Sequence, residues 1–226
     1  MYRYETHLHT FPVSKCGHAG VEECVGFYKE LGYDGIFITN HFLDGNINID
    51  RRVPYHERLD FYFSDYEKAR AVGEAIGIKV FCGVEISYAG TDMLVYGLDK
   101  AWFAAHPEIM EMRKSEECAF LMAQGALVIQ AHPFREAAYI DHIRLFPRQV
   151  HGVEVLNSAN FDSVNAMGQM YAAHYGLIPF AGSDNHHGGG RKNLAGMAFA
   201  EPIGSEADFV EQVKSGRGEI FTLNLE

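Results

Sequence analysis

The sequence predicts one α/β domain whose parallel strands close, or nearly close, into a barrel. Short apolar runs alternate with segments of helical periodicity along the chain, which is the pattern of parallel βαβ units. Six or more such units favour a closed sheet over an open one. Residues with metal-binding side chains stand where the predicted strands end, at the face that holds the active site in barrels of this class.

The composition agrees with a single domain over residues 1–226. This length suffices for one sizeable core. Apolar residues make up 47%, yet no run approaches the roughly 18 apolar residues of a membrane span, so no membrane partner is expected. The first residues do not resemble a secretory signal, and the four cysteines lack Cys-x-x-Cys spacing. We therefore expect a cytoplasmic location.

The charge of the chain limits its partners. The formal net charge is −11, whereas proteins that hold long nucleic acids usually present a basic surface to the phosphates. A long nucleic acid is therefore not an expected partner. The 12 histidines in an acidic chain instead favour bound metal cations. Nothing in the sequence indicates the oligomeric state.

The first strand carries the first pair of candidate ligands. Residues 2–5 alternate as a half-buried strand does, and the strand runs into His7 and His9. Residues two apart on a strand point to the same side. Two imidazoles placed in this way can chelate one divalent metal.

The next elements extend the pattern to the middle of the chain. A turn-rich loop over residues 11–20 precedes a helix that starts at Val21 and ends before Gly32, and a buried strand at 35–39 leads to His41. Residues 43–63 lack clean periodicity, which indicates a long excursion above the strand ends. The sequence Ser64-Asp65-Tyr66-Glu67 is typical of a capping box that opens a helix to about residue 76.

The remaining elements repeat this alternation. A strand at 79–85 delivers Glu85, and a shorter strand at 92–97 begins with Asp92. We further expect a helix at 108–124, strands at 126–130, 152–157 and 177–180, a helix at 163–175, a strand at 194–200 and a helix capped by Ser205.

Six polar residues follow these strand ends: His9, His41, Glu85, His132, Asn157 and Asp184. Each taken alone has an ordinary structural explanation, such as a capping carboxylate or a hydrogen-bonded core histidine. Imidazoles and carboxylates gathered in one barrel mouth, however, require a bound cation to offset their burial. The sequence therefore predicts a site for more than one metal ion.

Five motifs, in this order, resemble those of the polymerase and histidinol phosphatase (PHP) superfamily. They are His7-x-His9, Thr39-Asn40-His41, Gly83-Val84-Glu85, Ala131-His132-Pro133 and Gly182-Ser183-Asp184-Asn185-His186. The resemblance covers nearly the whole chain. It implies a distorted seven-stranded (β/α)7 TIM-like barrel of PHP type, two or three divalent metal ions and hydrolysis of a phosphoester.

The resemblance also implies which residues bind metal. The first ion would be held by His7, His9, Glu85 and Asp184, the second by Glu85 and His132, and the third by His41 and His186.

Three positions depart from the family pattern. Asn40 replaces the usual aspartate before His41, which we expect to affect only the surroundings of the metal. In the first loop the family often supplies another histidine, and His18 is the candidate, although Lys15 lies nearer the expected spacing. Asp92 stands where relatives offer a histidine to the second metal, with His106 as the alternative. A carboxylate there would favour harder ions such as Mn²⁺.

The expected chemistry is hydrolysis of a small phosphate monoester, as in histidinol phosphatases. Zn, Mn or Fe ions would lower the pKa of a bound water to about 7, which makes a metal-bound hydroxide the expected nucleophile. Glu85, Asp184 and His186 are the expected catalytic residues, and Arg135 and Arg191 are candidates to clamp the phosphate. Alternatives are a phosphodiesterase acting on nucleotides or oligonucleotide ends, and a metal-stabilised binding module without catalysis.

Overall fold

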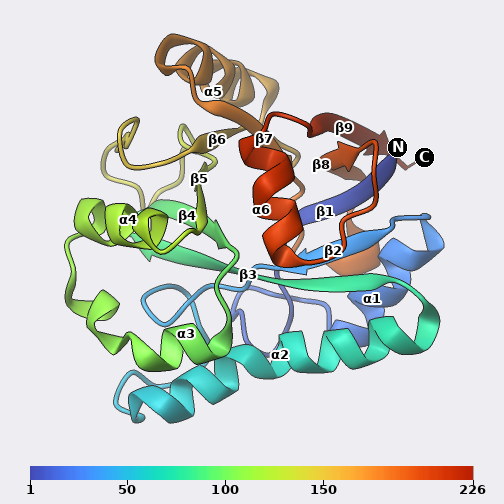
Figure 1. Ribbon diagram of the computed structural model, residues 1–226, viewed down its shortest axis with the longest axis horizontal. Helices are drawn as coiled ribbons and strands as arrows, with labels where there is room; N and C mark the ends of the chain where they lie inside the picture. The colour runs from blue at the N-terminus through green and yellow to red at the C-terminus, as the bar shows by residue number, and fades with distance from the viewer. Residues whose placement is uncertain (226) are drawn as a thin grey trace.

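The computed structural model describes residues 1–225, and its centre is a nine-stranded sheet that curls into a nearly closed barrel (Figure 1). Neighbouring strands follow the order β7-β6-β5-β4-β3-β2-β1-β8-β9. The strands are β1 (Tyr2–Leu8), β2 (Gly35–Ile38), β3 (Lys79–Tyr88), β4 (Thr91–Tyr96), β5 (Leu127–Ala131), β6 (Gly152–Asn157), β7 (Ile178–Gly182), β8 (Asn193–Phe199) and β9 (Glu219–Asn224).

Strands β1 to β7 run around the barrel in chain order, and the end of β1 meets the segment that follows β7. Leu8 and Asn185 form a parallel bridge there. The amide of His9 donates to the carbonyl of Asn185 at 3.0 Å, and the amide of Asn185 donates to the carbonyl of His7 at 3.2 Å. The first and last of the five sequence motifs are thereby brought side by side. The predicted TIM-like barrel is confirmed.

Helices lie outside the sheet, with α2 along one side and α5 on the opposite side (Figure 1). They are α1 (Val21–Glu30), α2 (Tyr55–Ile76), α3 (Lys100–Ala105), α4 (Lys114–Ala123), α5 (Asp162–Tyr175) and α6 (Glu206–Lys214), together with the 3₁₀ turns η1 (Pro107–Glu111) and η2 (Gly188–Gly190). None of these helices is long and apolar enough to cross a membrane.

The apolar core of the barrel positions the site by occupying the opposite end. Aromatic side chains from the strands pack together there, and Phe209 of α6 lies against Phe37 with ring centroids 4.2 Å apart. Tyr96 also belongs to this cluster, and its hydroxyl donates to the carbonyl of Thr6 at 2.7 Å. This apolar packing fills one end of the barrel. The polar side chains at the carboxyl ends of the strands lie at the other end, where the site is found.

The sheet is mixed, so the expectation of parallel units alone is wrong for two predicted strands, β4 and β8. Strand β4 is antiparallel to β3 and β5, and β8 pairs antiparallel with β1 and β9. Only Ala89 and Gly90 connect β3 to β4, both with positive φ, as in a two-residue hairpin turn. A parallel crossover needs a dozen residues or more. The hairpin places Asp92, near the start of β4, opposite Ser87 of β3.

The predicted excursion over residues 43–63 is wrong in its second part, because α2 begins at Tyr55 directly after Pro54. The predicted capping box is therefore inside the helix. Ser64 donates its hydroxyl to the carbonyl of Phe61 at 2.7 Å, and Asp65 turns inward to accept the hydroxyl of Thr10 at 2.8 Å. The Asp65 carboxylate thus serves to bind the buried Thr10 hydroxyl and does not mark the start of a helix.

Two further differences concern regions without strong local signals. The helix predicted at 108–124 is divided into η1 and α4, and the short helix α3 that ends before Pro107 is an additional element. Strand β9 was not predicted from the sequence, and it pairs with β8 over Asn193–Ala198. The other expected elements are found with small shifts of their ends, and β6 has the predicted bounds.

The close approach of β7 to β1 predicts that Gly182→Ala destabilises the protein. A Cβ at Gly182 would lie 2.5 Å from Cβ of His7 and 2.9 Å from Oε1 of Glu154. Overpacking of this kind costs about 1–3 kcal/mol, which denaturant unfolding would measure. As a control, Gly26→Ala in α1 meets nothing within 4 Å and should raise stability by about 0.5–1 kcal/mol. Equal stability of the two variants would contradict this packing.

Candidate metal centre

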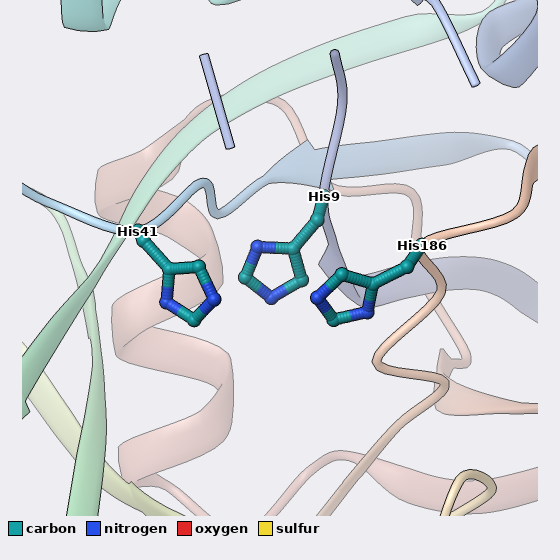
Figure 2. Close-up of side chains that lie close together, drawn as sticks. All are labelled: His9, His41 and His186. Carbon is teal, nitrogen blue, oxygen red and sulfur yellow. The ribbon is translucent and has the colours of Figure 1, made fainter. Parts of the chain in front are cut away.

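Seven predicted ligands meet at the carboxyl end of the barrel. We call them the rim cluster: His7, His9, His41, Glu85, His132, Asp184 and His186. They come from β1, from β3 and from the segments that follow β1, β2, β5 and β7. Figure 2 shows His9, His41 and His186 converging from three separate segments of the chain.

Backbone strain helps to aim two of these side chains. His132 has φ +28° and Asp184 has φ +51°, in a region that side-chain-bearing residues seldom adopt. Such conformations cost about 1–3 kcal/mol each and persist only where the surroundings hold them. The amide of His132 is held by Oε2 of Glu154 at 3.0 Å. Both residues thus leave their strands with side chains turned into the rim.

Glu85 lies at the centre of the rim cluster and is fully buried. Its Oε1 is 3.1 Å from Nε2 of His7 and 3.4 Å from Nε2 of His132. Its Oε2 is 3.3 Å from Nε2 of His9 and 2.7 Å from Nδ1 of His41. Within residues 1–225 neither oxygen accepts a hydrogen bond of acceptable geometry. Imidazole nitrogens therefore surround this carboxylate, but none of them forms a hydrogen bond of acceptable geometry with it.

Asp184 divides its two oxygens between two tasks. Its Oδ1 is 3.5 Å from Nε2 of His7 and 3.4 Å from Nε2 of His9. Its Oδ2 accepts from the Arg135 guanidinium and, at 3.4 Å, from the Asn157 amide. The arginine and the asparagine thus orient the carboxylate and leave Oδ1 for the cluster.

Partners outside the cluster fix the protonation of three rings. Nδ1 of His7 is 2.9 Å from Oε1 of Glu154, and Nδ1 of His186 is 3.0 Å from the carbonyl of Asp184. Nδ1 of His9 is 3.1 Å from the Ser14 hydroxyl, which itself donates to the side chain of Asn40. These contacts favour a proton on each Nδ1, so each Nε2 can offer a lone pair to a metal that displaces any second proton.

Ligand atoms of the rim cluster fall into three groups, each with its atoms within 4.8 Å of one another. The groups are His7 with His9 and Asp184, His7 with Glu85 and His132, and His9 with His41 and His186. Imidazole nitrogens and carboxylate oxygens suit divalent first-row metals. The rim cluster therefore suits the binding of divalent metal.

The electrostatics of the cluster call for a cation. Burial opposes a charge on His7, but Asp184, Glu154 and Glu85 outweigh it and hold its pKa well above the usual value. Burial also opposes ionisation of Glu85, yet His41 and His7 hold its pKa well below the usual value. The carboxylates therefore stay ionised at neutral pH. Without metal, the protonated His7 ring compensates part of this buried negative charge. A divalent ion that displaces the proton would take over this compensation.

A cavity of about 440 Å³ opens over the rim cluster. Its walls include Asp92, Arg135 and Tyr139, together with Cys16 of the first loop. Burial opposes ionisation of the Cys16 thiol, but hydrogen bonds with His186 and His41 lower its pKa to about 6. Oδ2 of Asp92 lies 3.7 Å from Nε2 of His132, at the edge of the second group.

The structure does not bring the other candidates to the cluster. His18 is exposed and stacks on His187 with ring centroids 4.7 Å apart, and the Lys15 side chain is exposed as well. His106 packs on Trp102 and pairs with a nearby glutamate. Arg191 donates from Nε to the carbonyl of Asn193 and is not among the residues that line the cavity.

Sequence reasoning missed three residues that support the ligands. Glu154 holds both His7 and His132, and Ser14 holds His9. Glu5 is fully buried and accepts from the amides of His7 and Ser183. A signal existed for Glu154, since it is a charged residue in the interior of a short strand that is otherwise largely apolar.

We predict that Glu154→Gln weakens metal binding about 10–100-fold, the usual cost of losing an outer partner of a ligand. The amide nitrogen would replace an oxygen that now accepts from His7, His132 or Asn157. Titration of metal-free protein with Zn²⁺ would measure the change. Glu201→Gln, at an exposed position, should bind as the wild type does, and equal affinity in both variants would contradict this role.

No protein-family model and no curated protein matches the chain. Among solved structures, a two-domain protein from Bacteroides vulgatus that contains a predicted PHP-like metal-dependent phosphoesterase has a TM-score of 0.71 at 16% identity. The match covers 97% of this chain but 64% of the two-domain protein, so the chain spans less than two thirds of it.

Two further structures agree. A candidate metal-dependent phosphoesterase from Bifidobacterium adolescentis has a TM-score of 0.59 at 15% identity, with 93% of this chain and 96% of that chain covered. An amidohydrolase from Chromobacterium violaceum, with bound sulfate, has a TM-score of 0.55 at 16% identity over 83% and 88% of the chains. At these identities the likeness establishes the fold. The chain has the TIM-like barrel fold of PHP-like proteins.

Proposed function

We propose that the chain is a metal-dependent phosphoesterase of the PHP superfamily that hydrolyses a small phosphate monoester. The observation that carries this proposal is the buried Glu85 carboxylate, whose oxygens lack hydrogen bonds and face four imidazoles below an open cavity. The five motifs in order and the shared fold with PHP-like structures support the family.

The rim cluster would hold two or three Zn, Mn or Fe ions. His7, His9, Glu85 and Asp184 would bind the first, Glu85 with His132 and Asp92 the second, and His41 with His186 the third. Ions so placed supply a water nucleophile near neutral pH and offset the negative charge of a phosphate. Of these residues, Glu85, Asp184 and His186 are the proposed catalytic set.

Arg135 is the proposed phosphate contact. Its Nε donates to Asn160 and its Nη2 to Asn157 and Asp184, which leaves Nη1 without a partner in residues 1–225. The guanidinium also lines the cavity, so the free group can donate to an anion there. Arg191 is the weaker candidate because it lies outside the cavity wall.

The cavity favours a small monoester over a polymer. Arg135 is the one lysine or arginine among the residues of the described chain that line it, whereas a polynucleotide needs several cations along its path. Asp92 adds negative charge to the same wall. One phosphate group at the cluster, with a compact leaving group, fits this distribution of charge.

Replacing the central carboxylate tests the proposal. Glu85→Gln should lower phosphatase activity at saturating metal by more than about 100-fold, beyond the range typical of outer partners. The amide is neutral and has one oxygen, so it cannot replace a negatively charged carboxylate that offers an oxygen to each of two cations. His18→Ala is the matched control, because this exposed ring stacks only on His187, and its activity should equal that of the wild type.

The assay should use p-nitrophenyl phosphate and bis(p-nitrophenyl) phosphate on the same preparations. We expect faster turnover of the monoester. Faster turnover of the diester would favour a phosphodiesterase, and no turnover of either by metal-loaded protein would favour a binding module. Equal activity of the wild type and Glu85→Gln would place the reaction elsewhere in the molecule.

A further inference from the structure

The thiol of Cys16 belongs to the wall of the cavity, yet the proposed chemistry gives it no role. It is half-buried and lines this cavity together with His41 and His186. The other cysteines, Cys24, Cys82 and Cys118, are buried in apolar packing away from this cavity. Cys16 is thus the single thiol of the described chain that is placed beside the rim cluster.

Hydrogen bonds on both sides fix Cys16 in this place. The amide of Lys15 donates to the carbonyl of Asn46 at 2.9 Å, which ties the loop to the segment after β2. The amide of His18 donates to the carbonyl of His186 at 2.7 Å, which ties it to the segment after β7. Gly17 completes the turn against the backbone of Thr10, where a Cβ would lie 2.9 Å away. The loop that carries Cys16 is therefore tied to the segments that carry His41 and His186.

The third group of ligand atoms needs what this thiol offers. His9, His41 and His186 supply three imidazoles and no carboxylate of their own. Nδ1 of His41 is buried without a hydrogen bond of acceptable geometry, so the group is not satisfied by the protein alone. A four-coordinate zinc site uses imidazole and thiolate ligands, and a thiolate would also bring the negative charge that the three rings lack.

We propose that Cys16 is a thiolate ligand of the third ion, the one that His41 and His186 would hold beside His9. The inference rests on the proposed metal centre and adds a ligand to it. It places the ligand one residue after Lys15, where spacing had suggested a histidine. Imidazole nitrogens with a sulfur favour softer ions such as Zn²⁺, whereas the Asp92 side of the cluster favours harder ones. The two ends of the cavity would therefore differ in metal preference.

Cobalt substitution tests the ligand directly. Metal-free protein is loaded with Co²⁺, and its absorption spectrum is recorded. Bound Co²⁺ gives visible ligand-field bands with any ligand set, while a thiolate ligand adds a charge-transfer band in the near ultraviolet. We expect both in the wild type and in the control Cys24→Ala. Cys16→Ser should keep the visible bands and lose the near-ultraviolet band.

Alkylation with iodoacetamide gives a second readout on the wild-type protein, independent of the folding of any variant. Metal-free protein should be modified at Cys16, and loading with Zn²⁺ should slow this modification at least tenfold. Visible bands without the charge-transfer band, or a charge-transfer band that survives in Cys16→Ser, would overturn the proposal for Cys16 alone. Absence of bound cobalt altogether would overturn the metal centre, and with it the proposed function.

Discussion

The structure depends on one buried charge. Glu85 is fully buried between four imidazoles, and its oxygens accept no hydrogen bond of acceptable geometry. An ionised carboxylate removed from water costs several kcal/mol unless it is paired and hydrogen-bonded, or bound to a metal. Glu154 and Ser14 contact Nδ1 of His7 and of His9, which turns Nε2 of both rings toward Glu85. The buried carboxylate is stable only with compensating cations, either protonated imidazoles or metal ions.

Closure of the barrel is what brings these acceptors together. His7 and Asp184 are separated by most of the chain, and they meet because Asn185 bridges to Leu8 at the end of β1. Gly182 allows the approach, since any side chain there would collide with His7. The apolar packing of α6 at the opposite end of the barrel supports the strands. This packing offsets the energetic cost of the strained backbone at Asp184.

Much of this arrangement could be predicted from the sequence, and the failures have two causes. Most ligands of the rim cluster could be predicted, because each follows or ends a short apolar run. Such a run can be recognised from neighbouring residues alone. The β3–β4 hairpin was missed since its two-residue turn, Ala89-Gly90, is not a typical turn sequence. Glu154 and Cys16 act on residues far away in the chain, so spacing alone could not assign them. His18 shows the converse, because a histidine near the expected spacing points to solvent and stacks on His187.

The central claim is that the rim cluster exists to hold metal, and elemental analysis tests it most directly. Protein purified without chelator should carry two or three first-row transition-metal ions per chain, as the three groups of ligand atoms require. Dialysis against a chelator should remove them, and added Zn²⁺, Mn²⁺ or Fe²⁺ should restore the same number. Fewer than one ion per chain, with no uptake when these metals are supplied, would contradict the account.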